Sequence, residues 1–180
     1  RDRSTTSYAA PEILSFIGNT NLSTRGGEII TIVGKNFGPR TFVNISASYG
    51  KISGPSFTAS MCNVTTDNTN IQCYSSPGAG RDLVWKIQIM DQMNIPSDNY
   101  ETAYSKPSIS RVFGDTNISV TGGDSIDIVG DNFGPLSQNR WNISAAYGFD
   151  VSSLFYTATD CEIKVEHTRI SCKTVKILAN

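Results

Sequence analysis

The stretch PEILSFIGNTNLSTRGGEIITIVGKNFGP, residues 11–39, returns as PSISRVFGDTNISVTGGDSIDIVGDNFGP at residues 107–135, at a constant offset of 96. Sixteen of these 29 positions are identical. The offset becomes 98 at Tyr49/Tyr147 and 99 at the cysteines, as expected where surface loops absorb small insertions. An internal repeat of this length predicts an array of similar small domains.

Length and charge narrow the class of protein. Two repeats in 180 residues give roughly 95 residues per domain, enough for one small hydrophobic core. The net charge is −1 and no basic run occurs, so we expect no nucleic-acid partner. No run approaches the length of apolar sequence that spans a bilayer, so we expect no membrane insertion by this segment.

Apolar residues alternate with polar ones in short runs separated by turn residues, which predicts β-strands. In the second strand of each repeat, Ile30 and Ile32 match Ile126 and Ile128, so these side chains are predicted to face the core. The inward positions of the third strand are predicted to be Val43, Ile45, Ala47 and Tyr49, matched by Trp141, Ile143, Ala145 and Tyr147. A later strand is predicted to place Leu83, Trp85, Ile87 and Ile89 inward and Val84, Lys86 and Gln88 outward.

Paired glycines mark the turns. Gly26-Gly27 and Gly122-Gly123 are predicted to turn the chain into the second strand with positive φ, where glycine has no steric cost. Gly34 and Gly130, with the Gly-Pro pairs that follow them, are predicted to end that strand. A phosphate-binding loop is not expected, because no glycine turn here opens into a helical pattern.

The four cysteines form two pairs at the same spacing. Cys62 and Cys73 are 11 residues apart, and so are Cys161 and Cys172. We predict one disulfide inside each repeat, and disulfides persist mainly in oxidising compartments. Four reduced, buried cysteines are the alternative; a zinc site fits less well, because the single histidine, His167, has no counterpart in repeat one.

Together these residues resemble a known family. The order of Pro11, Gly26-Gly27, an apolar strand, Asn36-Phe37-Gly38, paired cysteines and the Ser76–Gly80 loop is similar to that of IPT/TIG domains. These are immunoglobulin-like sandwiches of plexins, of related receptor ectodomains, of cell-surface proteins and of some transcription factors. The resemblance covers repeat one and about three-quarters of repeat two. It implies an all-β fold of tandem immunoglobulin-like β-sandwiches of the early-set type, and a binding or spacer module without catalytic residues.

No residues point to an active site or a cofactor, and we expect no enzyme. Asp124, Asp127 and Asp131 cluster in repeat two, but Glu28, Thr31 and Lys35 stand at their positions in repeat one, so no shared calcium site is expected. His167 lies between Cys161 and Cys172, and no nucleophile can be paired with it from the sequence.

Asparagine-linked glycans are the modification that the sequence favours. Sequons occur at Asn21, Asn44, Asn63, Asn117 and Asn142. Asn21/Asn117 and Asn44/Asn142 occupy matched repeat positions, and Asn44 and Asn142 fall on the predicted solvent face of the third strand. Alternatively, these asparagines merely suit turns and strand edges.

The ends of the sequence carry a further expectation. Thr6 and Tyr8 match Thr102 and Tyr104, so residues 1–10 are expected to be the closing strand of a preceding repeat, or a linker, with Ser4 to Tyr8 as a strand. Repeat one is expected at 11–106. Repeat two, at 107–180, lacks counterparts of the Leu83–Ile89 strand and of the closing strand. Either the chain is a window of a longer array, or its ends join head to tail with neighbouring copies.

We therefore expect a secreted or surface-displayed, disulfide-bonded glycoprotein with a structural or adhesive role in a rod, stalk or fibre. Its expected partners are neighbouring copies or repeats of the same protein. The alternative is a receptor or adhesion ectodomain that recognises a specific protein partner. An intracellular transcription-factor module is disfavoured by the charge, the cysteine pairs and the sequons.

Overall fold

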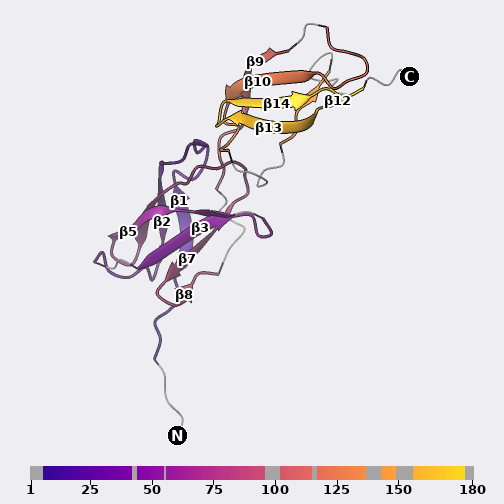
Figure 1. Cartoon of the computed structure of the whole chain (residues 1–180). Coiled ribbons are helices and arrows are strands. Elements are labelled where there is room, and N and C mark those ends of the chain that lie inside the picture. Colours follow the sequence, from indigo (N-terminus) through magenta and orange to yellow (C-terminus); the bar gives the residue numbers. More distant parts are fainter. Residues whose placement is uncertain are drawn as a thin grey trace. The chain divides into compact units, whose positions relative to one another are not determined.

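A computed structural model describes residues 6–41, 44–54, 56–95, 102–114, 117–136, 143–148 and 156–176. The chain divides into two compact units, Arg1–Tyr104 and Ser105–Asn180, a boundary two residues before the expected one. All regular secondary structure in these ranges is β-strand, and neighbouring strands within each sheet are antiparallel (Figure 1). The fold is all-β, as predicted.

The first sheet of unit 1 runs in the order β1-β2-β6-β5. Its strands are β1 (Glu12–Ile17), β2 (Ile29–Lys35), β5 (Ser60–Thr66) and β6 (Asn70–Tyr74). Ile30 and Ile32 of β2 and Ile71 of β6 are fully buried on its inner face. The period-two alternation of β2 thus gives this sheet one apolar and one solvent-facing side.

The second sheet of unit 1 runs in the order β4-β3-β7-β8. Its strands are β3 (Ile45–Gly50), β4 (Ser56–Thr58), β7 (Val84–Ile89) and β8 (Gln92–Met93). Two isolated bridges complete the unit: Leu22 pairs in parallel with Tyr104, and Leu83 pairs antiparallel with Thr102. The two sheets enclose a core of Tyr49, Trp85 and buried isoleucines, as in a sandwich.

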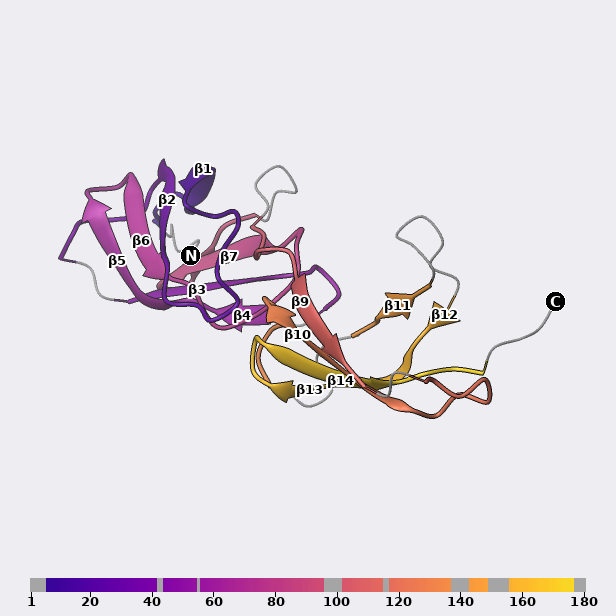
Figure 2. The same ribbon diagram turned by 90° about the horizontal axis from the view of Figure 1, so that it is seen from above.

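Unit 2 repeats the first sheet in the order β13-β14-β10-β9. Its strands are β9 (Ser108–Phe113), β10 (Ser125–Asp131), β13 (Thr159–Val165) and β14 (Arg169–Lys173). Its second sheet consists of β11 (Ala146–Tyr147) and β12 (Tyr156–Thr157) within the described ranges, and Figure 2 shows this pair beside the larger sheet. Ile126, Ile128, Ile163 and Ile170 form its core.

Of the residues predicted to face the core, Ile45, Ile143, Ala145 and Tyr147 are partly buried and the other described ones are buried; Val84 departs from its predicted outward position. Ile30, Ile32, Ile126, Ile128, Ala47, Tyr49, Leu83, Trp85, Ile87 and Ile89 are all buried. Val84 was expected to face outward but is only 8% exposed, so the start of β7 is covered on both faces. Val43 and Trp141 lie outside the described residues.

Two kinds of glycine position occur at the second strand. Gly26, Gly27, Gly122 and Gly123 have φ between 73° and 94°, which confirms the predicted turns. Gly34 instead lies inside β2, where an added Cβ would be 2.0 Å from the Glu12 carbonyl oxygen. Glycine is therefore needed there for the close approach of β1 and not for a turn.

The expected strand over Ser4 to Tyr8 is not found in its described part. Thr6, Ser7 and Tyr8 have no strand structure, and Tyr8 is 93% exposed. Ser4 and Thr5 lie outside the described residues. A lone extended segment forms a strand only when its backbone pairs with a neighbour; among the described residues, Thr6 to Tyr8 have no such backbone pairing, and Gln92 donates a side-chain hydrogen bond to the Tyr8 carbonyl.

Candidate functional site

Each unit carries a disulfide across one hairpin. Cys62 of β5 is bonded to Cys73 of β6, and Cys161 of β13 to Cys172 of β14, with Cα atoms 4.1 Å apart in both. These are the pairs that the spacing of the cysteines predicts. In both hairpins the strand register shifts at the first cysteine, so that two residues oppose one across the ladder. Each disulfide therefore bridges a β-bulge.

The bulge depends on a residue that the sequence did not mark. Met61 and Asp160 precede the two bulge cysteines, and both have φ of 49°. This is the left-handed region, which costs a residue with a Cβ about 1–2 kcal/mol. Aspartate adopts this conformation more readily than most residues, but methionine does not, so only the equivalence of positions 61 and 160 could have suggested a shared geometry.

A pair of tyrosines closes the end of the unit 1 core. The hydroxyl oxygens of Tyr49 and Tyr104 are 2.7 Å apart, and the Tyr104 hydroxyl donates to the Ser76 carbonyl at 2.7 Å. The Ser76 amide donates to the Tyr49 oxygen at 3.0 Å. The Phe57 ring lies edge-on to Tyr104, with centroids 5.4 Å apart. Tyr104, near the end of repeat one, thus places its ring in the core and its hydroxyl among hydrogen-bond partners. We call the hydrogen-bonded pair Tyr49 and Tyr104 the tyrosine plug, and the groups of Ser76 and Phe57 around it the socket.

Both hydroxyls of the plug are held neutral. Burial raises the pKa of Tyr104 far above its usual value, and its bond to Tyr49 raises it further. Burial also raises the pKa of Tyr49, against the opposing effect of the hydrogen bonds with Tyr104 and Ser76. The pair is therefore a structural hydrogen-bond network and not an acid–base centre at neutral pH.

Unit 2 keeps most of the same socket. Tyr147 matches Tyr49, and its oxygen accepts a hydrogen bond from the Val175 amide at 2.9 Å. Tyr156 stacks on Tyr147 with centroids 5.4 Å apart, as Phe57 packs on Tyr49 in unit 1. Within the described ranges no residue of unit 2 occupies the position of Tyr104; the Tyr147 hydroxyl instead makes a long 3.4 Å bond to the Val175 carbonyl.

The described sequons are exposed. Asn21, Asn44, Asn63 and Asn117 all lie at the surface, and Asn142 lies outside the described residues. Asn44 immediately precedes β3 rather than lying within it. Asn63 has an internal partner, because its Nδ2 donates to the Met61 carbonyl at 2.9 Å. Asn44 is therefore a more open acceptor than Asn63.

The acidic residues of unit 2 have local structural tasks. Asp124 accepts a hydrogen bond from the Ser119 amide at 2.6 Å, as Glu28 does from Ser23 in unit 1. Asp127 pairs with Arg169, which lowers the pKa of the Asp127 carboxyl. No group of three potential metal ligands occurs among the described residues. The apparent cluster is thus divided between a turn and a surface ion pair.

His167 has a structural role, which its backbone performs in a turn, and it is not part of a reactive site. It has φ of 66° in the hairpin turn between β13 and β14, and Asn68 has φ of 61° at the matched position. The His167 amide donates to the Gly134 carbonyl at 2.7 Å, and its carbonyl accepts from the Phe133 amide at 3.0 Å. The residue therefore ties the hairpin to the Asn-Phe-Gly-Pro loop, as Asn68 does in unit 1.

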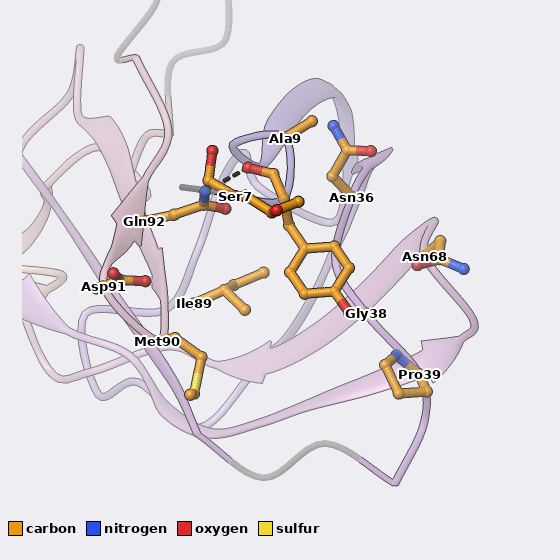
Figure 3. A pocket seen from close by; sticks show the side chains of 12 residues that line it. Ser7, Ala9, Asn36, Gly38, Pro39, Asn68, Ile89, Met90, Asp91 and Gln92 are labelled. Atoms are coloured by element: carbon orange, nitrogen blue, oxygen red, sulfur yellow. Dashed lines mark hydrogen bonds between the residues drawn. The ribbon is translucent and has the colours of Figure 1, made fainter. Parts of the chain in front are cut away.

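An open pocket of unit 1 lies beside residues 6–9 (Figure 3). Ile89, Met90, Asp91 and Gln92 face the loop that carries Asn36, Gly38 and Pro39. Asn36 Nδ2 donates to the Ala10 carbonyl at 2.9 Å, which fixes the entry of the chain into β1. The lining consists of hydroxyl, amide and apolar side chains with a single carboxylate, and it does not resemble a catalytic arrangement.

Among known proteins, the chain has a distant structural likeness. No family model and no curated protein matches the chain. It is similar to a solved structure of FdeC, an Escherichia coli adhesin, with 15% sequence identity and a TM-score of 0.38. The match covers 92% of this chain and 55% of that one, so the chain spans about half its length. No helix within the described ranges is long and apolar enough to cross a membrane.

Proposed function

We propose that this chain is a non-catalytic, extracellular module of the IPT/TIG type with a structural or adhesive role. It belongs to an array in which similar sandwiches follow one another, and its partners are neighbouring copies or repeats. The observation that carries the proposal is duplication. The same stapled sheet, β5-β6-β2-β1 and β13-β14-β10-β9, occurs twice and is fixed by equivalent glycine, asparagine and cysteine positions.

The disulfides support an oxidising compartment. Each one lies within a single sheet, and no cysteine is free. Such bonds persist outside the cytosol, where thiols are kept reduced. Extracellular location follows as the simplest reading, and with it access to the glycosylation machinery of a secretory pathway.

Exposed sequons at matched positions support glycosylation. Asn44 lies beside the solvent-facing Ser46 of β3, and Asn21 lies in an exposed turn. We expect glycans first at Asn44 and Asn142, next at Asn21 and Asn117, and least at Asn63, which adjoins a disulfide and has an internal hydrogen bond. Regularly placed glycans would keep neighbouring rods hydrated and resistant to proteolysis.

The test of the glycan prediction is secretion of the full chain from a eukaryotic cell, followed by enzymatic deglycosylation in heavy water and peptide mass spectrometry. Mass-labelled aspartate should appear at positions 44 and 142. An Asn44→Gln variant, which removes one acceptor and keeps the amide, is the matched control. Unmodified Asn44 and Asn142 in secreted material would contradict the glycan part of the proposal.

The adhesive or structural role is tested by self-association of the same secreted protein. We expect concentration-dependent association in sedimentation velocity and adhesion of coated beads to one another. Strictly monomeric protein whose beads never adhere would overturn the proposal and favour the receptor-ectodomain alternative.

A further inference from the structure

The two cysteines of each disulfide differ in their access to solvent. Cys73 is 0% exposed and Cys172 is 1% exposed, whereas Cys62 and Cys161, the first cysteine of each pair, are partly exposed. The same asymmetry therefore occurs in both units. The first cysteine of each pair is the one that a reagent in solution can reach without opening the core.

The place of each disulfide in its sheet gives this asymmetry a direction. Cys62 lies on β5, the outer strand of the order β1-β2-β6-β5, and Cys73 lies on β6, which has β2 on its other side (Figure 2). In the register of β2 with β6, Ile30 stands opposite Cys73 and is itself fully buried. Cys172 of β14 has Ile126 of β10 at the same place. A buried isoleucine therefore stands beyond the inner cysteine of each pair, and the edge of the sheet lies beyond the outer one.

Thiol–disulfide exchange is sensitive to this arrangement. A thiolate attacks one sulfur from the side opposite the other sulfur, bonds to it, and expels the other sulfur as a thiolate. The line of attack on Cys73 passes over β2, where Ile30 stands. The line of attack on Cys62 passes over the outer edge of β5, which pairs with no further strand in the described part of unit 1. Attack on the folded protein is therefore directed to Cys62.

We propose that Cys62 and Cys161 are modification sites at which the folded chain accepts small thiols, such as glutathione, as mixed disulfides. In unit 1 the thiolate sulfur bonds to Cys62 Sγ, the bond between Cys62 and Cys73 breaks, and its electron pair leaves on Cys73 Sγ. Cys73 then takes up the proton that the reagent lost. One disulfide replaces another and one thiol replaces another, so no further oxidant or reductant is needed.

The released thiol stays where it can reverse the modification. Cys73 lies in the ladder between β2 and β6, opposite Ile30, and its Cα is 4.1 Å from that of Cys62 in the closed form. A thiol held beside its target attacks it much faster than a second thiol from solution does. Burial also keeps Cys73 away from larger reagents. The mixed disulfide is therefore reversible, and the return attack by Cys73 limits its lifetime.

The experiment treats the oxidised full chain with reduced glutathione at about pH 8 under native conditions. The reaction is stopped with acid, the chain is unfolded, and free thiols are capped with a maleimide. We expect glutathione on Cys62 and Cys161 and maleimide on Cys73 and Cys172, with at least about tenfold preference for this arrangement over the reverse one.

The sequence allows the two cysteines of each pair to be mapped separately by mass spectrometry. Cleavage at Asp67 separates the cysteines of unit 1, and cleavage at Lys164 separates those of unit 2. A chain treated in concentrated guanidinium is the unfolded reference, in which the preference between the two cysteines should disappear.

The dependence on glutathione concentration separates attack on the folded chain from attack after unfolding. For the folded chain, the rate of adduct formation should rise in proportion to glutathione. If attack needed global unfolding, the rate would level off at the unfolding rate, and both cysteines of a pair would be modified alike.

Two single variants give an independent measurement. Cys73→Ser leaves Cys62 as a free thiol, and Cys62→Ser leaves Cys73. In the folded chain, the Cys62 thiol should react with a disulfide reagent at least about tenfold faster than the Cys73 thiol. NMR signals of Ile30 and Ile71 check that unit 1 is folded in both variants. If either variant is unfolded, the adduct pattern of the unchanged chain decides.

Four outcomes would overturn the proposal: no adduct on the folded chain, equal modification of Cys62 and Cys73, a rate that levels off at the unfolding rate, or equal reactivity of the two folded variants. None of these measurements involves glycans or self-association. A failure here is therefore distinct from a failure of the proposed function.

Discussion

At the scale of single residues, the two units are alike in backbone conformation even where their side chains differ. Met61 and Asp160 share a left-handed φ of 49°, and Asn68 and His167 share one near 60°. Met and Asp have nothing in common except their place before a bulge cysteine. The bulge, and not the side chain, is therefore what the repeat preserves.

The bulge predicts an unusual response to glycine. Met61→Gly should leave the free energy of unfolding unchanged or raise it by up to about 1 kcal/mol, because relief of the left-handed strain offsets glycine's entropy cost. Ser60→Gly, one residue earlier in the same strand, should lower it by about 0.5–1 kcal/mol. Urea denaturation of both variants checks the contrast, and an equal loss in both would show that Met61 is not strained.

The tyrosine plug predicts a large effect from one hydroxyl. Tyr104→Phe leaves the Tyr49 hydroxyl and the Ser76 carbonyl without their shared partner, so we expect unit 1 to lose about 1–3 kcal/mol of stability. Tyr8→Phe is the control, because Tyr8 matches Tyr104 in sequence and is exposed. Equal stability of both variants would show that the buried hydroxyl network contributes nothing.

The same plug makes the stability of unit 1 depend on pH in the alkaline range. The pKa values of Tyr49 and Tyr104 are both raised in the folded protein above the ordinary 10.0, so folding favours the neutral hydroxyls. Their contribution is complete below pH 10 and is lost progressively above it. Urea denaturation at about pH 8 and about pH 11 should show the loss, and Tyr104→Phe should reduce it; an unchanged slope would contradict this.

At the scale of elements, the disulfide hairpins are independent staples. Each closes a loop with a separation of 11 residues, for which chain entropy predicts roughly 3 kcal/mol of stabilisation. The double variant Cys62→Ser/Cys73→Ser should destabilise unit 1 alone, and Cys161→Ser/Cys172→Ser unit 2 alone. Residue-resolved hydrogen exchange measures the stability of each unit separately in both variants. Equal destabilisation of the two units by either variant would show that the two disulfide hairpins do not act independently.

Sequence comparison predicted the elements whose side chains see the same environment in both repeats. Ile30 and Ile126 are buried on matched strands because the facing strand β6 or β14 is also repeated. It failed where the environment is not repeated. Val84 is buried by neighbours on the outer face of its strand, which the alternation of apolar and polar residues along the strand does not reveal. β11 spans only two residues, whereas β3 spans six.

The tyrosine plug marks the limit of such reasoning at a site. The match of Thr6 and Tyr8 to Thr102 and Tyr104 showed that the motif recurs, but not that Tyr104 would reach Tyr49 across the sandwich. That contact joins residues 55 positions apart in the chain. Nothing local encodes it. The cysteine pairs were easier, because both partners lie in one hairpin and share one spacing.

At the scale of the whole molecule, the two units should differ in stability. Unit 1 has two four-stranded sheets, whereas the second sheet of unit 2 has two described strands and the facing β9 is exposed throughout. Because less apolar area is buried, unit 2 should unfold at a lower temperature. In a Trp141→Phe variant, Trp85 is the remaining tryptophan, so its fluorescence reports the unfolding of unit 1. We expect the fluorescence transition at a higher temperature than the first calorimetric transition. A single transition that coincides in both measurements would contradict this.

The position of the disulfides also sets how far the molecule can be stretched. A pulled repeat extends only through residues outside its cross-linked loop, because Cys62 and Cys73 remain 4.1 Å apart at their Cα atoms while the bond is intact. The enclosed residues would otherwise add roughly 35 Å of contour length. In each repeat, the contour length inside the disulfide loop therefore cannot be extended by force while the bond is intact, but it becomes available when the bond is reduced. The redox state of the surroundings thus sets the maximal extension of the chain.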